Sequence, residues 1–63
     1  MTELYNVPRD TKVDLRHLGL RFVGGDEIKE AIFSHMDGMY GLLYVNGERI
    51  NLASWTPVKI INN

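Results

Sequence analysis

Residues 37–47 read Asp37-Gly38-Met39-Tyr40-Gly41-Leu42-Leu43-Tyr44-Val45-Asn46-Gly47. The dipeptides at the two ends, Asp-Gly and Asn-Gly, are those preferred by two-residue type I′ hairpin turns, in which both central residues need a positive φ. The segment between them has the length and residue types of one β-strand. The pattern therefore predicts a three-stranded antiparallel meander with strands at 29–36, 39–45 and 48–53.

Residues 26–36 allow a second interpretation. Asp26 can cap a helix that carries Ile28, Ile32 and Met36 on one stripe and ends at Gly38. The spacing of four residues is also even, so the same three side chains share one face of a strand. We expect an all-β domain, and the alternative is an α+β domain with a helix at about 26–36.

The rest of the chain suggests shorter elements. Residues 1–8 are expected to form an extended arm, because Pro8 lacks a backbone donor and biases Val7 toward extended geometry. Alternating polar and apolar residues predict a strand at 12–15, and a last strand is expected at 58–61. Three other segments are less regular: 17–23 fits a strand or an extended loop, 24–26 a turn, and 53–57 a short helical turn.

Five strands in so short a chain leave edges exposed unless the sheet curls. We therefore expect a small five-stranded SH3-like barrel that forms a single domain over residues 1–63.

Composition limits the function. Hydrophobic residues make up 44% of the 63-residue chain and charged residues 24%, which is typical of a globular domain. Seven Lys or Arg and eight Asp or Glu give a net charge of −1, which argues against a binder that works by bulk positive charge. We expect no membrane span, since no stretch approaches roughly 20 apolar residues, and no secretory signal at the N-terminus.

The two turns also predict which side chains share a side of the meander. Met36 is expected opposite Met39 and His35 opposite Tyr40, and in the second hairpin Val45 is expected opposite Glu48. One side then forms the core, joined by residues from outside the meander. The predicted core is Ile32, Met36, Met39, Leu43, Val45, Ile50 and Leu52, with Val13, Leu15, Trp55, Val58 and Ile60.

The other side of the meander is rich in aromatic residues. Exposed aromatic side chains beside an arginine are typical of interaction surfaces. Alternatively, the arm or residues 17–23 cover this side as a second core layer, or two copies of the chain meet across it. The side also carries Leu42, and the predicted partner-binding residues are Phe33, His35, Tyr40, Tyr44, Arg49 and Asn51.

No catalytic residue, metal site or cofactor is predicted. His17 and His35 lie far apart, and the chain has no cysteine to complete a zinc site. Ser34 and His35 are adjacent, so on a strand they should point to opposite sides, which is wrong for a nucleophile and its base. A domain of this size seldom encloses the pocket of roughly 300 Å³ or more that an enzyme needs.

Three short segments carry a family resemblance, and they are His35-Met36-Asp37-Gly38-Met39-Tyr40, Asn51-Leu52-Ala53-Ser54-Trp55-Thr56-Pro57-Val58 and Val7-Pro8-Arg9. They resemble short, mostly uncharacterised proteins encoded by tailed bacteriophages. The resemblance implies an SH3-like small barrel, a phage origin and action in the cytoplasm of the bacterial host. It brings no catalytic residues.

These observations together predict a non-enzymatic protein-binding module, a phage accessory protein that binds and modulates or inhibits a host factor. The partner is a host or viral protein. One alternative is a single-stranded nucleic-acid-binding protein, since small barrels stack bases on exposed aromatic rings. The other is a small structural or assembly subunit of a virion, which forms a homo-oligomer.

Overall fold

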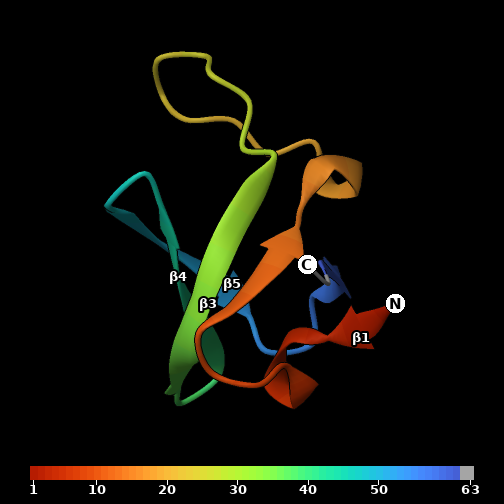
Figure 1. Cartoon of the computed structure of the whole chain (residues 1–63). Coiled ribbons are helices and arrows are strands. Elements are labelled where there is room, and N and C mark those ends of the chain that lie inside the picture. The colour runs from red at the N-terminus through yellow and green to blue at the C-terminus, as the bar shows by residue number, and fades with distance from the viewer. Residues whose placement is uncertain (62–63) are drawn as a thin grey trace.

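The computed structural model describes residues 1–61 and is built from β-strands (Figure 1). The elements are β1 (Thr2–Glu3), η1 (Leu4–Asn6), β2 (Thr11–Asp14), η2 (Arg16–Leu18), β3 (Glu30–Asp37), β4 (Tyr40–Val45), β5 (Glu48–Ala53) and β6 (Pro57–Ile60), where η marks a 3₁₀ turn. The all-β class and the meander β3-β4-β5 are confirmed. Residues 26–36 form loop and strand, so the helical alternative is wrong.

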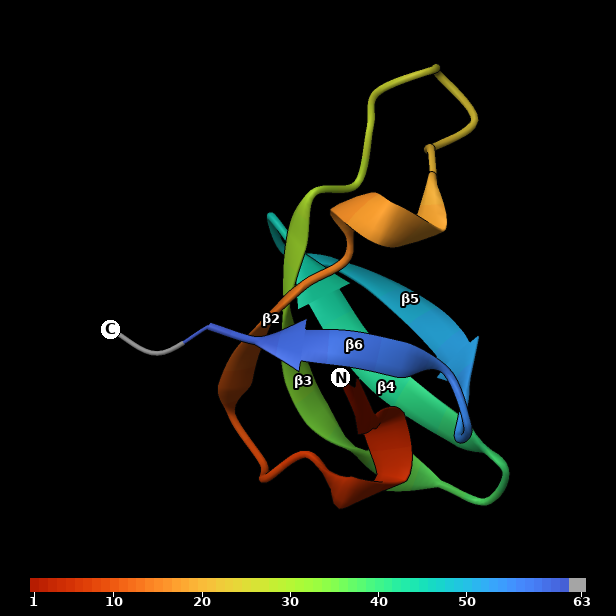
Figure 2. The same cartoon turned by 90° about the vertical axis from the view of Figure 1, so that its right-hand side faces the viewer.

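The six strands form one antiparallel sheet in the order β1-β6-β2-β3-β4-β5. The short strand β1 raises the number above the five that we expected. The sheet bends strongly, so that β6 passes in front of β3 and β4 in Figure 2, and both parts contribute to one core. Since β1 and β5 stand at opposite ends of the strand order, the sheet does not close into the expected barrel.

The core lies inside the bend of the sheet. Its buried side chains are Leu4, Val7, Val13, Leu15, Ile28, Ala31, Phe33, Leu43, Val45 and Val58. Five of them belong to the predicted core, and four other predicted residues, Met36, Ile50, Leu52 and Ile60, are half-buried against it. Ile32, Met39 and Trp55 are 42%, 66% and 61% exposed, so placing them in the core was wrong.

The N-terminal segment is part of the core rather than a free arm. Leu4 is completely buried and Val7 is 6% exposed. The backbone N–H of Leu4 donates to the Thr56 carbonyl at 2.9 Å, and that of Tyr5 donates to the Ser54 carbonyl at 3.0 Å. The prediction of an extended arm at residues 1–8 therefore missed the turn η1, which places Leu4 inside the sheet.

The second hairpin has the predicted turn and register. Asn46 and Gly47 have φ values of 51° and 85°, as a type I′ turn requires. Val45 pairs with Glu48, and the register continues to Tyr40 opposite Ala53 without a shift. The Asn-Gly dipeptide thus determines which residues of β4 and β5 face each other.

The first hairpin differs from the prediction in two ways. Its turn is Gly38-Met39 rather than Asp37-Gly38, so that Asp37 pairs with Tyr40 and His35 with Leu42. Gly38 has a φ of 61° while Met39 does not lie in the positive-φ region, which is the pattern of a type II′ turn. A β-bulge then shifts the register between Phe33 and His35, and Phe33 pairs with Leu43.

Residues 15–29 form a long connection that projects beyond the end of the sheet (Figure 1). It begins with η2, and it is held to the sheet by His17, whose Nε2–H donates to the Pro57 carbonyl at 2.7 Å. Further along, the backbones of Arg21 and Glu27 form an isolated antiparallel β-bridge. The Gly25 N–H donates to the Phe22 carbonyl at 2.8 Å. The connection is an irregular loop with a turn at its tip.

The segment before β6 is a tight turn. The Thr56 N–H donates to the Ala53 carbonyl at 3.0 Å, and the Ser54 N–H donates to the Met39 carbonyl at 2.8 Å. The short helical turn that we expected at 53–57 is therefore a single hydrogen-bonded turn.

Candidate functional site

One side of the meander faces away from the core, and we call it the outer face. Because residues paired across two strands point to the same side of a sheet, the register assigns the members of this face. They are Ile32, His35 and Asp37 on β3, Tyr40, Leu42 and Tyr44 on β4, and Arg49, Asn51 and Ala53 on β5.

Five of the six predicted partner-binding residues lie on this face. Tyr40 and Tyr44 are 56% and 40% exposed, and Arg49 and Asn51 are exposed beside them on β5. His35 is half-buried opposite Leu42. The structure therefore brings together the tyrosines, the arginine, the asparagine and the histidine.

Phe33 is not part of the outer face, and its assignment as a binding residue was wrong. Its side chain is 2% exposed and belongs to the core. The reason is the bulge at Ser34, since one additional residue in a strand turns every residue beyond it to the other side. Ile32 is turned outward for the same reason and lies opposite Tyr44.

Ile32 extends the outer face toward β2. The register aligns Lys12, Ile32, Tyr44 and Arg49 as neighbours across β2, β3, β4 and β5. An aliphatic and an aromatic side chain thus stand between two cations. Counting from the turns missed Ile32 because no residue type in 29–36 marks the position of the bulge.

Leu42 is the buried centre of the outer face. It is 8% exposed although it does not belong to the core cluster. Its neighbours on this side are His35 and Asn51, which pair with it, and Tyr40 and Tyr44, which stand two residues away along β4. The side chains around Leu42 therefore shield it from solvent, and the face has an apolar centre.

Charged side chains lie at both margins of the outer face, Lys12 on β2 and Arg49 on β5. Lys12 Nζ lies 3.1 Å from Glu30 Oε1, so its charge is already paired. Among residues 1–61, neither of the two salt bridges nor any of the side-chain hydrogen bonds includes Arg49. The guanidinium of Arg49 is therefore available to an external acceptor.

Asp14 and Arg16 form a second ion pair where β2 ends. Arg16 Nε and Nη2 donate to the Asp14 carboxylate, with Nη2 2.6 Å from Oδ2, and the Arg16 backbone N–H donates to Oδ1 at 2.9 Å. The guanidinium hydrogen bonds, followed by the backbone one, lower the pKa of Asp14 from 3.8 to about 2. This pair holds the start of η2 in place.

Ser34 and His35 interact, contrary to the sequence-based expectation. Ser34 Oγ lies 2.8 Å from His35 Nδ1, and both residues are half-buried. The bulge places the two neighbouring side chains on the same side, which regular strand geometry does not allow. This side-chain hydrogen bond lies within the β-bulge of β3 and joins its two residues.

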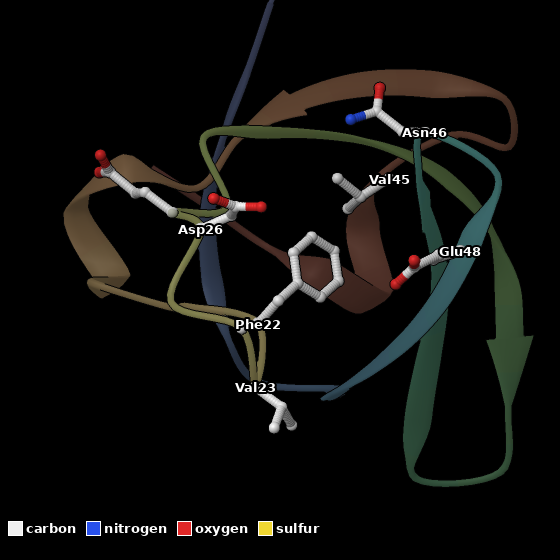
Figure 3. A pocket seen from close by; sticks show the side chains of 8 residues that line it. Phe22, Val23, Asp26, Val45, Asn46 and Glu48 are labelled. Carbon is white, nitrogen blue, oxygen red and sulfur yellow. The ribbon is translucent and has the colours of Figure 1, made fainter.

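A separate hollow lies between the loop tip and the second hairpin (Figure 3). Its volume is about 590 Å³, and it is open to solvent. The Phe22 ring points into it toward Val45, while the carboxylates of Asp26 and Glu48 flank the ring and Val23 points away. The lining of the hollow is apolar at the base and acidic at the rim.

The described residues hold no group of three or more His, Cys, Asp or Glu side chains that could bind a metal ion. Over the same residues, no helix has the length and apolar character needed to cross a membrane. No protein-family model, no curated protein and no solved structure matches this chain. The candidate site therefore depends on the geometry of the outer face alone.

Proposed function

We propose that the chain is a non-enzymatic protein-binding module that docks its partner on the outer face. The observation that supports this most strongly is the exposure of Ile32, Tyr40 and Tyr44 on the side of the sheet opposite a complete core. Folding does not require these side chains to be apolar there. Large aromatic side chains around a shielded aliphatic centre are typical of the residues that dominate binding energy in protein interfaces.

The chemistry of the face indicates the kind of partner. Leu42, Ile32 and the two tyrosine rings offer an apolar surface, and Arg49 supplies an uncompensated cation at its β5 side. The complementary surface is an apolar patch with a carboxylate near its margin, since arginine binds carboxylates with two parallel hydrogen bonds. The resemblance to phage proteins supports a host protein as the partner, with modulation or inhibition of that host factor as the outcome.

A protein fits this face better than single-stranded nucleic acid. Base stacking requires exposed rings beside a groove of positive charge. Here Lys12 is paired with Glu30, Asp37 stands opposite Tyr40, and the net charge of the chain is −1. The outer face therefore supplies rings but little free positive charge.

Capture from a bacterial lysate tests the proposal. The bait is the wild-type chain, and the test variant is Tyr40→Ala with Arg49→Ala. A matched control is Tyr5→Ala with Arg9→Ala, which removes the same two residue types at exposed positions of the N-terminal segment. Circular dichroism confirms that each variant is folded.

We expect a stoichiometric protein that the wild type and the control retain and the outer-face variant loses. Equal retention by both variants would refute the role of the outer face. Nucleic acid in the eluate, released steeply by salt, would favour the nucleic-acid alternative. An eluate that contains the bait alone in a large assembly would favour a structural subunit.

A further inference from the structure

Strand β5 forms one margin of the sheet, and no other strand lies along its outward edge (Figure 2). It is a regular strand of six residues, Glu48–Ala53, and it pairs with β4 without a register shift. It contains no proline or glycine. Natural sheets usually protect a long edge with proline, charged side chains, a bulge or a covering segment, and the charged residues of β5 are confined to its first two positions, Glu48 and Arg49. The other margin, β1, has two residues.

The hairpin geometry identifies the unpaired backbone groups of β5. In a two-residue hairpin the closing pair, Val45 and Glu48, exchanges hydrogen bonds, and the pattern alternates along the ladder. The N–H and C=O groups of Arg49, Asn51 and Ala53 therefore point outward. Within residues 1–61 the Ala53 carbonyl accepts a bond from Thr56, and no other backbone bond outside the ladder reaches these three residues.

We propose that β5 pairs with β5 of a second copy of this chain, antiparallel and around a two-fold axis at Asn51. A twofold antiparallel strand pair is self-complementary, as an isologous dimer requires. In this register Asn51 exchanges two backbone hydrogen bonds with Asn51 of the second copy. Arg49 pairs with Ala53 of the second copy in the same way. All outward donors of the strand are then satisfied.

The side chains favour this register. On the core side it places the half-buried Ile50 opposite Leu52 of the second copy, so each covers the other's remaining apolar surface. On the outer face no like charges stand opposite each other. The neighbouring register, centred on Ile50, places the Glu48 carboxylate opposite Leu52. The register centred on Asn51 therefore places apolar side chains opposite apolar ones and is the better match.

The pairing leaves the outer face free and joins two copies of it side by side in one continuous sheet. It also carries Trp55, which follows β5 and is 61% exposed, toward the Asn46-Gly47 turn of the second copy. A single strand pair is smaller than the roughly 800 Å² per partner of a standard interface. We therefore expect dissociation constants of about 1 µM to 1 mM.

Analytical ultracentrifugation across this concentration range tests the dimer. Asn51→Pro removes one outward N–H and leaves the bonds to β4 intact, because proline is tolerated where the N–H faces away from the sheet. Asn51→Thr is the matched control, since it removes the same amide and keeps the N–H. We expect a concentration-dependent dimer for the wild type and the control, and a folded monomer for the proline variant. A wild type that remains monomeric at 1 mM, or a proline variant that still dimerises, overturns the proposal.

Cysteine cross-linking tests the register without relying on proline. The chain has no native cysteine. In the proposed pair, the Cα atoms at position 51 stand about 5.5 Å apart, within disulfide range, whereas those at position 48 are displaced by about 20 Å along the strands. We expect Asn51→Cys to oxidise to a covalent dimer at least tenfold faster than Glu48→Cys. Equal rates, or no covalent dimer at position 51, would overturn the proposed register.

Discussion

Leu4 occupies the space where any other residue at position 41 would place its side chain. A Cβ built on Gly41 would lie 2.9 Å from Leu4 Cγ and 3.1 Å from Phe33 Cε1. Leu4 belongs to the N-terminal turn η1, and Gly41 belongs to β4, the middle strand of the meander. The contact therefore packs the N-terminal segment against the meander. The lack of a side chain at position 41 allows the N-terminal segment to enter the core.

Gly41→Ala should therefore destabilise the fold. The added methyl group forces Leu4 or Phe33 to move, and overpacking of this kind costs about 1–3 kcal/mol. Urea denaturation measures the free energy of unfolding. In the double variant Leu4→Ala with Gly41→Ala, the smaller residue at position 4 makes room, so we expect the two losses not to add. An unchanged stability of Gly41→Ala, or strict additivity, would contradict the contact.

Leu4→Ala should be among the most damaging changes in the chain. Leu4 is completely buried, and removing a buried leucine side chain costs about 2–5 kcal/mol. That is a large share of the stability of a small domain. Its neighbour Tyr5 is 55% exposed, so Tyr5→Ala is the control and should change the thermal midpoint little. Similar effects of both changes would show that the N-terminal segment does not contribute to the core.

Deletion of Ser34 tests the bulge. Without the additional residue, a regular β3 keeps its pairing near the turn and also keeps Phe33 opposite Leu43 and Ile32 opposite Tyr44. The deletion should therefore leave Phe33 in the core and change the free energy of unfolding little, as measured by urea denaturation. Ser34→Ala, which keeps the bulge and removes the hydrogen bond to His35, is the matched control. A loss of about 3 kcal/mol or more in the deletion variant, as expected if Phe33 left the core, would contradict the register of β3.

The stability of the protein should depend on Asp14 in acid. Its pKa is lowered to about 2 from 3.8 by the hydrogen bonds from Arg16. A carboxyl group with a lowered pKa in the folded state stabilises that state above its unfolded pKa. The contribution is therefore complete above about pH 4 and disappears as the pH falls toward 2. Asp14→Asn keeps an acceptor for the Arg16 N–H but cannot titrate, so its thermal midpoint should fall less than that of the wild type between pH 4 and pH 2. Parallel profiles would show that the ion pair contributes nothing.

The sequence was most informative where local chemistry sets the geometry. The Asn46-Gly47 turn determines the whole register of β4 and β5, and with it the outward direction of Tyr44 and Arg49. At the first hairpin, the expected turn was Asp37-Gly38 and the observed turn is Gly38-Met39. This change shifts the partner of each β3 residue near the turn by two positions along β4. An even shift leaves every side chain on the same side, so Tyr40 and His35 were assigned correctly although their partners were not.

The errors arose where distant parts of the chain decide the structure. The bulge at Ser34 has no mark in the sequence, and it exchanges the sides of Ile32 and Phe33. The burial of Leu4 depends on the space above Gly41, and that space exists only once the sheet has bent. The position of the N-terminal segment against the sheet also depends on backbone hydrogen bonds to Ser54 and Thr56. The local conformational preferences of residues 1–8 cannot reveal these distant partners.

Covalent labelling of the aromatic side chains tests the role of the outer face most directly. The chain has three tyrosines and one tryptophan, and Tyr5, Tyr40, Tyr44 and Trp55 are all at least 40% exposed. Tyr40 and Tyr44 lie on the outer face, whereas Tyr5 lies in the N-terminal turn η1. The labelling rate of each is measured for the free chain and for the complex recovered from lysate, at the same concentration. We predict strong protection of Tyr40 and Tyr44 with no change at Tyr5. Protection of Tyr5 while Tyr40 and Tyr44 stay reactive would place the partner elsewhere and contradict the proposed function.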